Sequence, residues 1–267
     1  MASFFSQRHH FFEFGDQPWL TGVLRASYLD GLNLGLRLGG QFSKVHLALH
    51  AWADHRKGQP ILDLGSGGGG PVETILRAAE KDGLRLPKIY LSDLFPSPRH
   101  YQNLQDALGA DRIDYLKEPL SAWSANQPPF ELRSICSTFH HFKPAEARLL
   151  VERALTSGSG LFILEPLQRN LRHFLMVLLS GPFPYMLAPF FADRWSWRKF
   201  LLCTVLPVAP LMVAFDGCVS VLRTYTAQEI TDMIPPALRD EVEVHQGTLP
   251  YMGLYGALHV SLIRKPT

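Results

Sequence analysis

The feature that most constrains this chain is a glycine-rich loop at residues 63–70, with the sequence Asp-Leu-Gly-Ser-Gly-Gly-Gly-Gly. A short apolar segment, 60–64, leads into the loop, and Pro71 and a helical pattern follow it. Proline is tolerated in the first turn of a helix, so the expected order is strand, tight turn and helix. Glycines let the backbone approach a ligand, and the first N–H groups of the helix point toward it. The loop therefore predicts a nucleotide-type ligand.

After this loop, strand and helix patterns alternate along the chain. The spacing of apolar residues predicts strands at 89–93, 112–116, 132–136, 160–164, 242–245 and 258–263, with helices between most of them. Thr226 and Glu229 have the spacing of a capping box and predict a helix that continues to Met233. This alternation predicts an α/β fold with a mostly parallel sheet and helices on both faces.

Two kinds of cofactor compete for the glycine loop. Gly65, Gly67 and Gly70 satisfy the G-x-G-x-x-G pattern of dinucleotide-binding proteins, and both kinds require an acid after the second strand, which Asp93 supplies. Asp63 favours S-adenosylmethionine, because its methionine part carries an ammonium and a sulfonium, whereas a pyrophosphate is anionic. The helical segment before the first strand and the Phe-His-His-Phe run at 139–142 favour the same cofactor. An NAD-dependent oxidoreductase stays as an alternative.

Residues 60–165 resemble the class I S-adenosylmethionine-dependent methyltransferases in three features: the motif Asp63 to Gly69, the acid Asp93, and the histidine pair after the fourth strand. The resemblance implies a Rossmann-like sheet of seven strands, of which the last is antiparallel. It implies S-adenosylmethionine as the cofactor, and Ser121 stands where the family often holds the adenine amino group. The residues expected to bind the cofactor are Asp63, Gly65, Ser66, Gly67, Gly69, Asp93, Leu94, Ser121, Ala122 and Thr138.

The flanks of the core complete the expected domain organisation. Residues 12–19 and 216–225 look like the flanks of a bacterial small-molecule subgroup of the same family. The interpretation divides the chain into an N-terminal helical lid, the cofactor-binding core, an apolar helical insertion or cap after the fifth strand, and the C-terminal part of the core sheet. These segments cover residues 1–58, 59–165, 166–222 and 223–267.

Few residue types are needed for methyl transfer, because the donor is already activated and the enzyme mainly aligns the acceptor and excludes water. A base is needed only when the acceptor must lose a proton. His140 and His141 are the candidate bases, and Glu165 is expected either to orient a histidine or to bind a polar acceptor. Packing or backbone binding is the alternative for all three. The residues expected on the acceptor side are Trp19, Phe139, Tyr185, Arg223 and Tyr225.

Composition narrows the classes of function. A net charge of +2 and the lack of a clustered basic face argue against nucleic acid as a partner. Three cysteines with no C-x-x-C pair, and a first segment without the pattern of a signal peptide, favour the cytoplasm. The histidines lie in adjacent pairs rather than at metal-ligand spacing, so no metal site is expected. The expected reaction is methyl transfer to an oxygen or nitrogen of a hydrophobic or aromatic small molecule. A non-catalytic protein that binds the cofactor or a lipid is a further alternative.

The insertion is the most apolar part of the chain. Residues 174–192 and 200–215 contain no charged residue, and 193–199 between them combines two tryptophans with cations. Several prolines interrupt both runs, which argues against membrane-spanning helices. Three interpretations stay open: a cap over a lipophilic acceptor, a homodimer interface, and peripheral contact with the inner face of the membrane. Tryptophan and arginine suit the lipid headgroup layer, which is the reason for the third.

Overall fold

The computed structural model describes residues 2–38, 42, 44–191, 195–251 and 255–265. The chain forms two compact units, which are described separately. The sheet unit consists of residues 42–166 and 226–267, and the helical unit of residues 1–41 and 167–225.

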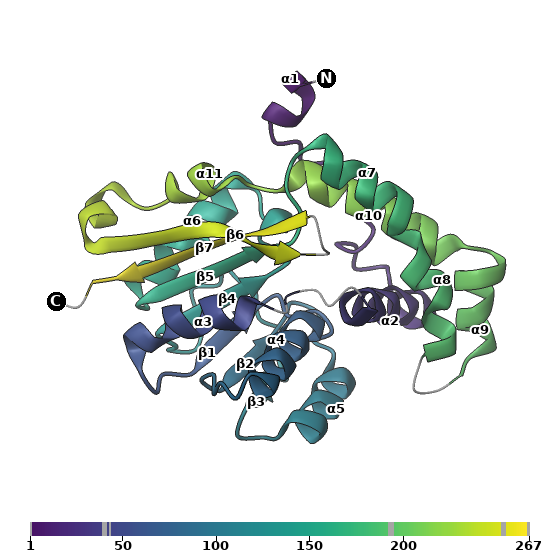
Figure 1. Ribbon diagram of the computed structural model, residues 1–267, viewed down its shortest axis with the longest axis horizontal. Coiled ribbons are helices and arrows are strands. Elements are labelled where there is room, and N and C mark those ends of the chain that lie inside the picture. Colours follow the sequence, from purple (N-terminus) through teal and green to yellow (C-terminus); the bar gives the residue numbers. More distant parts are fainter. Residues whose placement is uncertain (1, 39–41, 43, 192–194, 252–254, 266–267) are drawn as a thin grey trace. The chain divides into compact units, whose positions relative to one another are not determined.

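The sheet unit contains seven strands in the order β3-β2-β1-β4-β5-β7-β6 (Figure 1). The first five along the order are parallel to one another, and β7 is antiparallel to both β5 and β6. This confirms the expected mostly parallel, seven-stranded sheet with an antiparallel last strand. The strands are β1 (Ile61–Leu64), β2 (Ile89–Ser92), β3 (Ile113–Tyr115), β4 (Leu132–Cys136), β5 (Gly160–Glu165), β6 (Val242–Tyr251) and β7 (Tyr255–Arg264).

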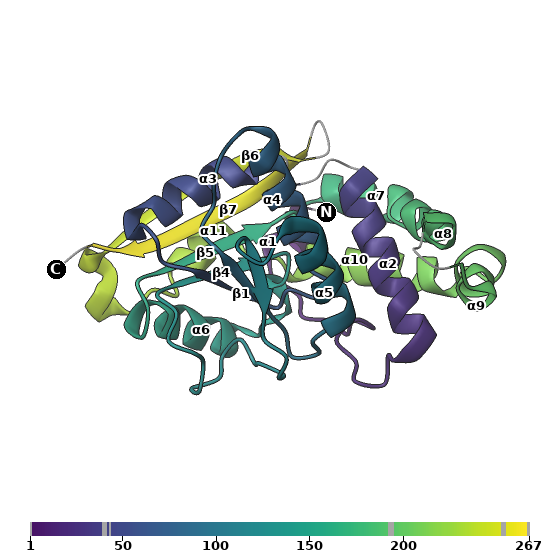
Figure 2. The ribbon, with the colours of Figure 1, turned by 90° about the horizontal axis from the view of Figure 1, so that it is seen from below.

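Helices cover both faces of this sheet, with α6 on one face and α3 and α4 on the other (Figures 1 and 2). Every residue of β1, β4 and β5 is buried, as expected for parallel strands that are covered on both sides. The helical elements of the unit are α3 (Val45–Ala53), η1 (Asp54–Arg56), α4 (Gly70–Lys81), α5 (Pro98–Leu108), η2 (Phe139–His141), α6 (Pro144–Thr156), α11 (Ala227–Thr231) and η4 (Pro236–Glu241).

Some boundaries differ from the sequence expectations. The hairpin of β6 and β7 is longer than expected, because its antiparallel pairing continues from Val242 and Arg264 to the facing residues Tyr251 and Tyr255. Helix α11 is shorter than expected and ends at Thr231. Its capping box is confirmed: the Glu229 N–H donates to Thr226 Oγ1 at 3.1 Å, and the Thr226 N–H donates to Glu229 Oε2 at 2.7 Å.

Helix α3 belongs to the sheet unit, although the sequence interpretation placed it in the segment 1–58. Tertiary contacts explain this position. Trp52 Nε1 donates to the carbonyl oxygen of Leu262 in β7 at 3.1 Å, and its ring lies 5.6 Å from the ring of Phe162 in β5. The buried indole therefore joins α3 to the two strands beneath it.

The helical unit is built from α2 packed against α8 and α7 packed against α10. By length and apolar composition, the segment Leu171–Phe191 could cross a membrane, and a second candidate pair of helices is bent by 59°. Its elements are α1 (Ala2–Ser6), α2 (Gly22–Leu38), α7 (Leu171–Ser180), α8 (Pro182–Phe191), α9 (Trp197–Phe200), the π-helix η3 (Leu201–Val205) and α10 (Val208–Arg223).

Candidate active site

The glycine loop joins β1 to α4, and three of its glycines have left-handed backbone conformations. The φ angles are +73° at Gly65, +56° at Gly67 and +79° at Gly69. A Cβ on Gly65 would lie 2.7 Å from Thr138 Cγ2, and a Cβ on Gly69 would collide with the side chain of Leu104. A Cβ on Gly67 would meet nothing within 4 Å. Internal packing therefore requires glycine at positions 65 and 69, whereas Gly67 presents bare backbone to open space.

Asp93 follows β2 and joins the end of that strand to the glycine loop. The Gly67 N–H donates to Asp93 Oδ2 at 2.7 Å, and the Phe95 N–H donates to Oδ1 at 2.8 Å. The carboxylate is half-buried, and Leu94 beside it is exposed. The acid is thus held in a fixed orientation at the same sheet edge as the open backbone of Gly67.

The segment expected to contact the adenine also lies at this edge. The Leu120 N–H donates to the carbonyl oxygen of Asp93 at 2.8 Å, which brings Ser121 and the buried Ala122 to the end of β2. The Ser121 hydroxyl oxygen is buried and has no hydrogen-bond partner among the described residues. Buried polar atoms are nearly always paired, so this hydroxyl is available to a ligand.

Asp63, the last acid before the loop, is fully buried within the sheet. Its carboxylate accepts hydrogen bonds from Ser66 Oγ at 2.6 Å and from Ser134 Oγ at 2.7 Å. Burial raises the pKa of Asp63 to about 6, against the lowering effect of these two hydroxyls. Ser134 was not expected from the sequence. It meets Asp63 because β1 and β4 pair in parallel with these two residues opposite each other.

The raised pKa of Asp63 predicts a dependence of stability on pH. Between about pH 4 and pH 6 the folded protein binds a proton at Asp63 that the unfolded chain does not, so the free energy of unfolding falls as the pH rises through this window. The full effect is about 3 kcal/mol for a pKa raised from 3.8 to about 6. Urea unfolding across this pH range should show a flatter profile for Asp63→Asn than for the wild type. The exposed Asp111→Asn is the matched control, and parallel profiles for the wild type and Asp63→Asn would contradict the prediction.

Two of the three candidate catalytic residues, Glu165 and His140, meet at the carboxyl ends of β4 and β5. Glu165 ends β5, and His140 lies in the turn η2 after β4. The His140 N–H donates to Glu165 Oε1 at 3.0 Å, and His140 Nδ1 lies 2.8 Å from Glu165 Oε2. Both side chains are buried. An ionised carboxylate only accepts hydrogen bonds, so Nδ1 is the donor of this contact.

The neighbours of this pair include one residue that sequence reasoning missed. The half-buried ring of His141 lies 4.3 Å from the ring of His140, measured between centroids. Ser137, between β4 and η2, has a φ of +65°, which is strained for a residue other than glycine. Its buried hydroxyl has no hydrogen-bond partner among the described residues. No local signal in the sequence distinguishes this serine from others.

The residues expected on the acceptor side fall in both units. Phe139 is fully buried in the sheet unit, with its ring 6.1 Å from that of Phe142. The other four lie in the helical unit, where Trp19 is exposed and Tyr225 is buried. Arg8 Cζ lies over the Tyr225 ring, 4.0 Å from its centroid. Tyr185 packs against α2, where a Cβ on Gly31 would collide with its ring. Their assignment to acceptor binding stays a prediction.

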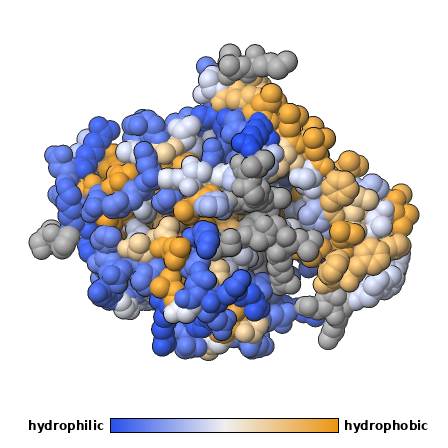
Figure 3. Space-filling model, in the orientation of Figure 1, coloured by the Kyte–Doolittle hydropathy of each residue, from blue (hydrophilic) through white to orange (hydrophobic). Residues whose placement is uncertain are grey.

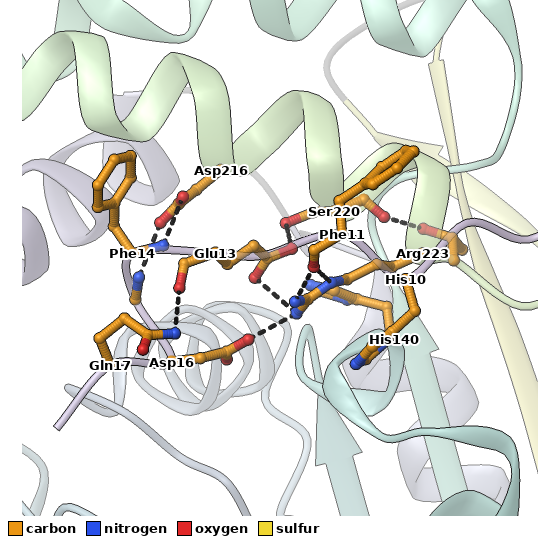
Figure 4. Close-up of polar contacts among 12 residues, drawn as sticks. His10, Phe11, Glu13, Phe14, Asp16, Gln17, His140, Asp216, Ser220 and Arg223 are labelled. Atoms are coloured by element: carbon orange, nitrogen blue, oxygen red, sulfur yellow. Dashed lines mark hydrogen bonds and ion pairs between the residues drawn. The ribbon is translucent and has the colours of Figure 1, made fainter.

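Arg223 is part of a buried ion-pair network inside the helical unit (Figure 4). Its guanidinium lies 3.2 Å from Glu13 Oε2 and 2.7 Å from Asp16 Oδ2, and its Nε donates to the carbonyl oxygen of Phe11 at 2.9 Å. One turn earlier on α10, the Ser220 hydroxyl donates to Glu13 Oε1 at 3.1 Å. The network therefore ties the N-terminal segment to the end of α10.

Asp216, which precedes Ser220 and Arg223 on α10, binds the same N-terminal segment (Figure 4). Its carboxylate accepts hydrogen bonds from the N–H groups of Phe14 and Gly15, both at 2.8 Å, and from the Tyr28 hydroxyl at 3.1 Å. Burial is the main cause that raises the pKa of Asp216 to about 6. The flanks 12–19 and 216–225, which resemblance had singled out separately, thus form one structure.

A group of possible metal ligands lies beside β6, the strand at one side of the sheet. His55, Glu243 and His245 offer ligand atoms that all lie within 4.8 Å of one another, and all three residues are exposed. His55 and His245 are far apart in the sequence, so no local ligand spacing indicates this group. It is separated from β1 and the glycine loop by three intervening strands and has no part in the site described above.

Comparison with solved structures identifies the fold. Magnesium protoporphyrin IX methyltransferase from Synechocystis PCC 6803, solved with bound SAH, matches over 86% of this chain and 85% of its own, with a TM-score of 0.50 and 12% identity. An O-methyltransferase family protein from Burkholderia thailandensis matches over 86% of this chain at a TM-score of 0.50 and 15% identity. This chain covers 57% of that second protein.

No protein-family model matches the sequence, and no curated protein matches it either. At these identities the solved structures establish the fold alone. Together with the strand order, they show that the chain has the fold of the class I S-adenosylmethionine-dependent methyltransferases.

Proposed function

We propose that this protein is an S-adenosylmethionine-dependent methyltransferase that methylates an oxygen or nitrogen of a lipophilic or aromatic small molecule. One observation carries the proposal: the open backbone of Gly67, the oriented carboxylate of Asp93 and the Glu165–His140 pair all lie at the carboxyl ends of neighbouring parallel strands. Ligands of open α/β sheets bind at this edge. Both reported structural neighbours are methyltransferases, and one was solved with bound SAH.

The described residues fit the cofactor. The space over Gly67 admits a ligand that a side chain would displace, and the unpaired hydroxyl of Ser121 offers the adenine a polar partner. In this proposal Asp93, whose carboxylate is half-buried and oriented by the Gly67 N–H, accepts hydrogen bonds from the ribose hydroxyls. Asp63 supplies a buried carboxylate beneath the loop, which favours the cationic methionine part when ionised. When bound, the cofactor supplies a methyl group on a sulfonium.

The Glu165–His140 pair supplies the chemistry on the acceptor side. One Glu165 oxygen accepts from the imidazole Nδ1 and the other from the His140 backbone N–H, so the contact at Nδ1 limits rotation of the ring. His140 Nε2 then accepts the proton of an acceptor hydroxyl or amine, and Glu165 stabilises the resulting imidazolium. A neutral acceptor nitrogen would need only alignment, so the pair matters most for an acceptor that must lose a proton.

The cofactor assignment predicts a loss of affinity in two variants. Gly67→Val places a branched side chain where the ligand approaches, and Asp93→Ala removes the acceptor for the ribose. Each is expected to weaken S-adenosylmethionine binding by roughly tenfold or more, because a hydrogen bond to a charged group contributes about 1.5–3 kcal/mol. Calorimetry on the purified variants measures this directly.

Gly83→Val is the matched control for Gly67→Val. Gly83 also has a positive φ, +68°, and a Cβ there would likewise meet nothing within 4 Å. The two variants carry similar backbone strain, so only ligand approach distinguishes them. Unchanged affinity in folded Gly67→Val and Asp93→Ala would refute the assignment. Titration of the wild type with NAD tests the alternative of an oxidoreductase, which predicts that NAD binds and S-adenosylmethionine does not.

A further inference from the structure

The helical unit carries many exposed apolar side chains on α7, α8 and α10, which we call the apolar face. On α7 and α8 they recur at positions i, i+4, i+7 and i+8, and on α10 at i, i+3 and i+7, so each helix contributes one stripe. Figure 3 shows this hydrophobic surface over α7 and α8. The face comprises Leu171, Leu175, Leu178, Leu179, Phe183, Leu187, Phe190, Phe191, Val208, Leu211 and Phe215, which are 40–68% exposed.

The opposite sides of these helices are already occupied within the helical unit. Val177 of α7 faces α10, where a Cβ on Gly217 would collide with it, and Tyr185 of α8 faces α2 at Gly31. Only 28% of the most apolar window in Leu171–Phe191 is buried, whereas the core helix of a soluble protein is mostly buried. The side chains of the apolar face are therefore not needed for packing within the unit. Large exposed apolar patches mark interaction sites.

The chemistry of the face favours lipid over a protein partner. Protein interfaces carry about one hydrogen bond per 100–200 Å². Between residues 174 and 191 the only polar side chains are Ser180 and Tyr185. Tyr185 is buried, and the Ser180 hydroxyl donates to the carbonyl oxygen of Met176 at 2.6 Å. The stripes of α7 and α8 thus offer a second copy of the chain very little to hydrogen-bond.

Charge and tryptophan content at the end of the face specify the kind of lipid surface. Residues 195–199, at this end of the helical unit, contain Arg198 and Lys199 and no acid, and Lys199 pairs with Asp30 of α2. Trp195 and Trp197 are 64% and 59% exposed, and the guanidinium of Arg198 lies 5.6 Å from the ring centroid of Trp197. Exposed tryptophan beside cations suits the headgroup layer of an anionic bilayer.

The same helices are unsuited to crossing the bilayer. Helix α10 has Asp216 and Arg223 on its packed side, bound to the N-terminal segment through the contacts in Figure 4. Helix α8 contains Pro189, and the pair formed by 197–205 and 208–223 is bent by 59°. Broken backbone and buried charges are costly in hydrocarbon. A position within the headgroup layer leaves these groups on the protein side.

We infer that the apolar face docks the protein on an anionic bilayer, with α7 and α8 lying in the plane of the surface. The leucine and phenylalanine stripes enter the acyl boundary, and Trp195, Trp197 and Arg198 lie among the headgroups. The inference rests on this face alone and does not depend on the proposed methyl transfer. If both hold, the protein takes its lipophilic acceptor from the bilayer.

Vesicle flotation of the full chain tests the inference. The wild type is expected to float with vesicles that contain phosphatidylglycerol and to bind pure phosphatidylcholine vesicles more weakly. Leu179→Gln/Phe183→Gln should lower binding by roughly tenfold or more, because two of the most exposed apolar side chains no longer enter the acyl region. Arg198→Glu should weaken binding to the anionic vesicles alone. Leu47→Gln, at an exposed leucine of α3 outside the face, is the control and should bind as the wild type does.

A second measurement leaves every residue of the apolar face unchanged and follows tryptophan fluorescence on vesicles. Brominated lipid should quench part of the tryptophan fluorescence, and Trp195→Phe/Trp197→Phe should lose that quenched part. A wild type that stays off both kinds of vesicle would overturn the inference. So would a dimer, seen by light scattering, that Leu179→Gln/Phe183→Gln dissociates, because a second copy would then cover the face. If alkaline carbonate failed to extract the protein from the vesicles, the protein would be inserted in the bilayer, and the inference of surface docking would be wrong.

Discussion

Replacement of His140 by alanine is expected to lower methyl-transfer turnover by about 10²–10⁴-fold while leaving the affinity for S-adenosylmethionine nearly unchanged. His140 is positioned by two hydrogen bonds to Glu165, one from the imidazole Nδ1 and one from its backbone N–H, and neither involves the glycine loop. Its loss therefore removes the proton acceptor without disturbing the cofactor cradle. The measurement is single-turnover formation of SAH with an acceptor found by screening, alongside calorimetry of cofactor binding.

Two further variants make this result specific. Glu165→Gln keeps the size of the side chain but removes the carboxylate that accepts from His140 Nδ1, so turnover should fall while the KM for the acceptor stays unchanged. A purely structural glutamate would leave turnover unchanged in this isosteric variant. His141→Ala is the matched neighbour. Severe loss in His141→Ala alone would transfer the role of base to His141, and wild-type turnover in both histidine variants at every pH would mean that alignment alone drives the reaction.

Arg223→Met is expected to lower the free energy of unfolding by about 3–5 kcal/mol, the cost of leaving a buried charge without its partner. Glu13 is 1% exposed and would lose the guanidinium 3.2 Å from its carboxylate, and Asp16 would lose the same guanidinium at 2.7 Å. The measurement combines urea unfolding with hydrogen exchange at residues 8–16. Exchange reports on the helical unit even if the two units unfold separately.

The control for Arg223→Met removes the carboxylates as well. Glu13→Gln/Asp16→Asn/Arg223→Met has no unpaired buried charge, so it should recover much of the stability that Arg223→Met loses. A cost below about 1 kcal/mol for Arg223→Met would contradict the prediction, because that value is typical of a solvent-exposed ion pair.

Local rules explain why much of the fold could be predicted from the sequence. The strand at 132–136 and the capping box at Thr226 and Glu229 are observed as expected, and the glycine loop lies between β1 and α4. Each depends on residues within a few positions of one another: apolar runs, a hydroxyl three residues before a glutamate, glycines where φ is positive. The longer β6–β7 hairpin was missed because antiparallel pairing depends on the partner strand, which lies outside any local window.

The sequence indicated which residues form the candidate site, but it did not indicate which of them contact one another. Asp63, Asp93, His140 and Glu165 were named from their places at strand ends, and the strand order explains why they share one edge. That Ser134 binds Asp63 and that Glu165 holds His140 depends on register between neighbouring strands. Ser137 and its strained φ carry no local signal at all.

The sequence by itself determined where most strands and helices of the sheet unit lie and where the glycine turn between β1 and α4 falls, since these follow from short-range sterics and hydrogen bonding. Only the tertiary structure decided that the N-terminal segment binds α10 through Asp216 and Arg223, because those contacts join residues about two hundred positions apart. It also decided which side of each apolar helix is covered. The composition shows that α7 and α8 are apolar. Which of their side chains are exposed depends on the elements that pack against them, and those contacts form only in the folded chain.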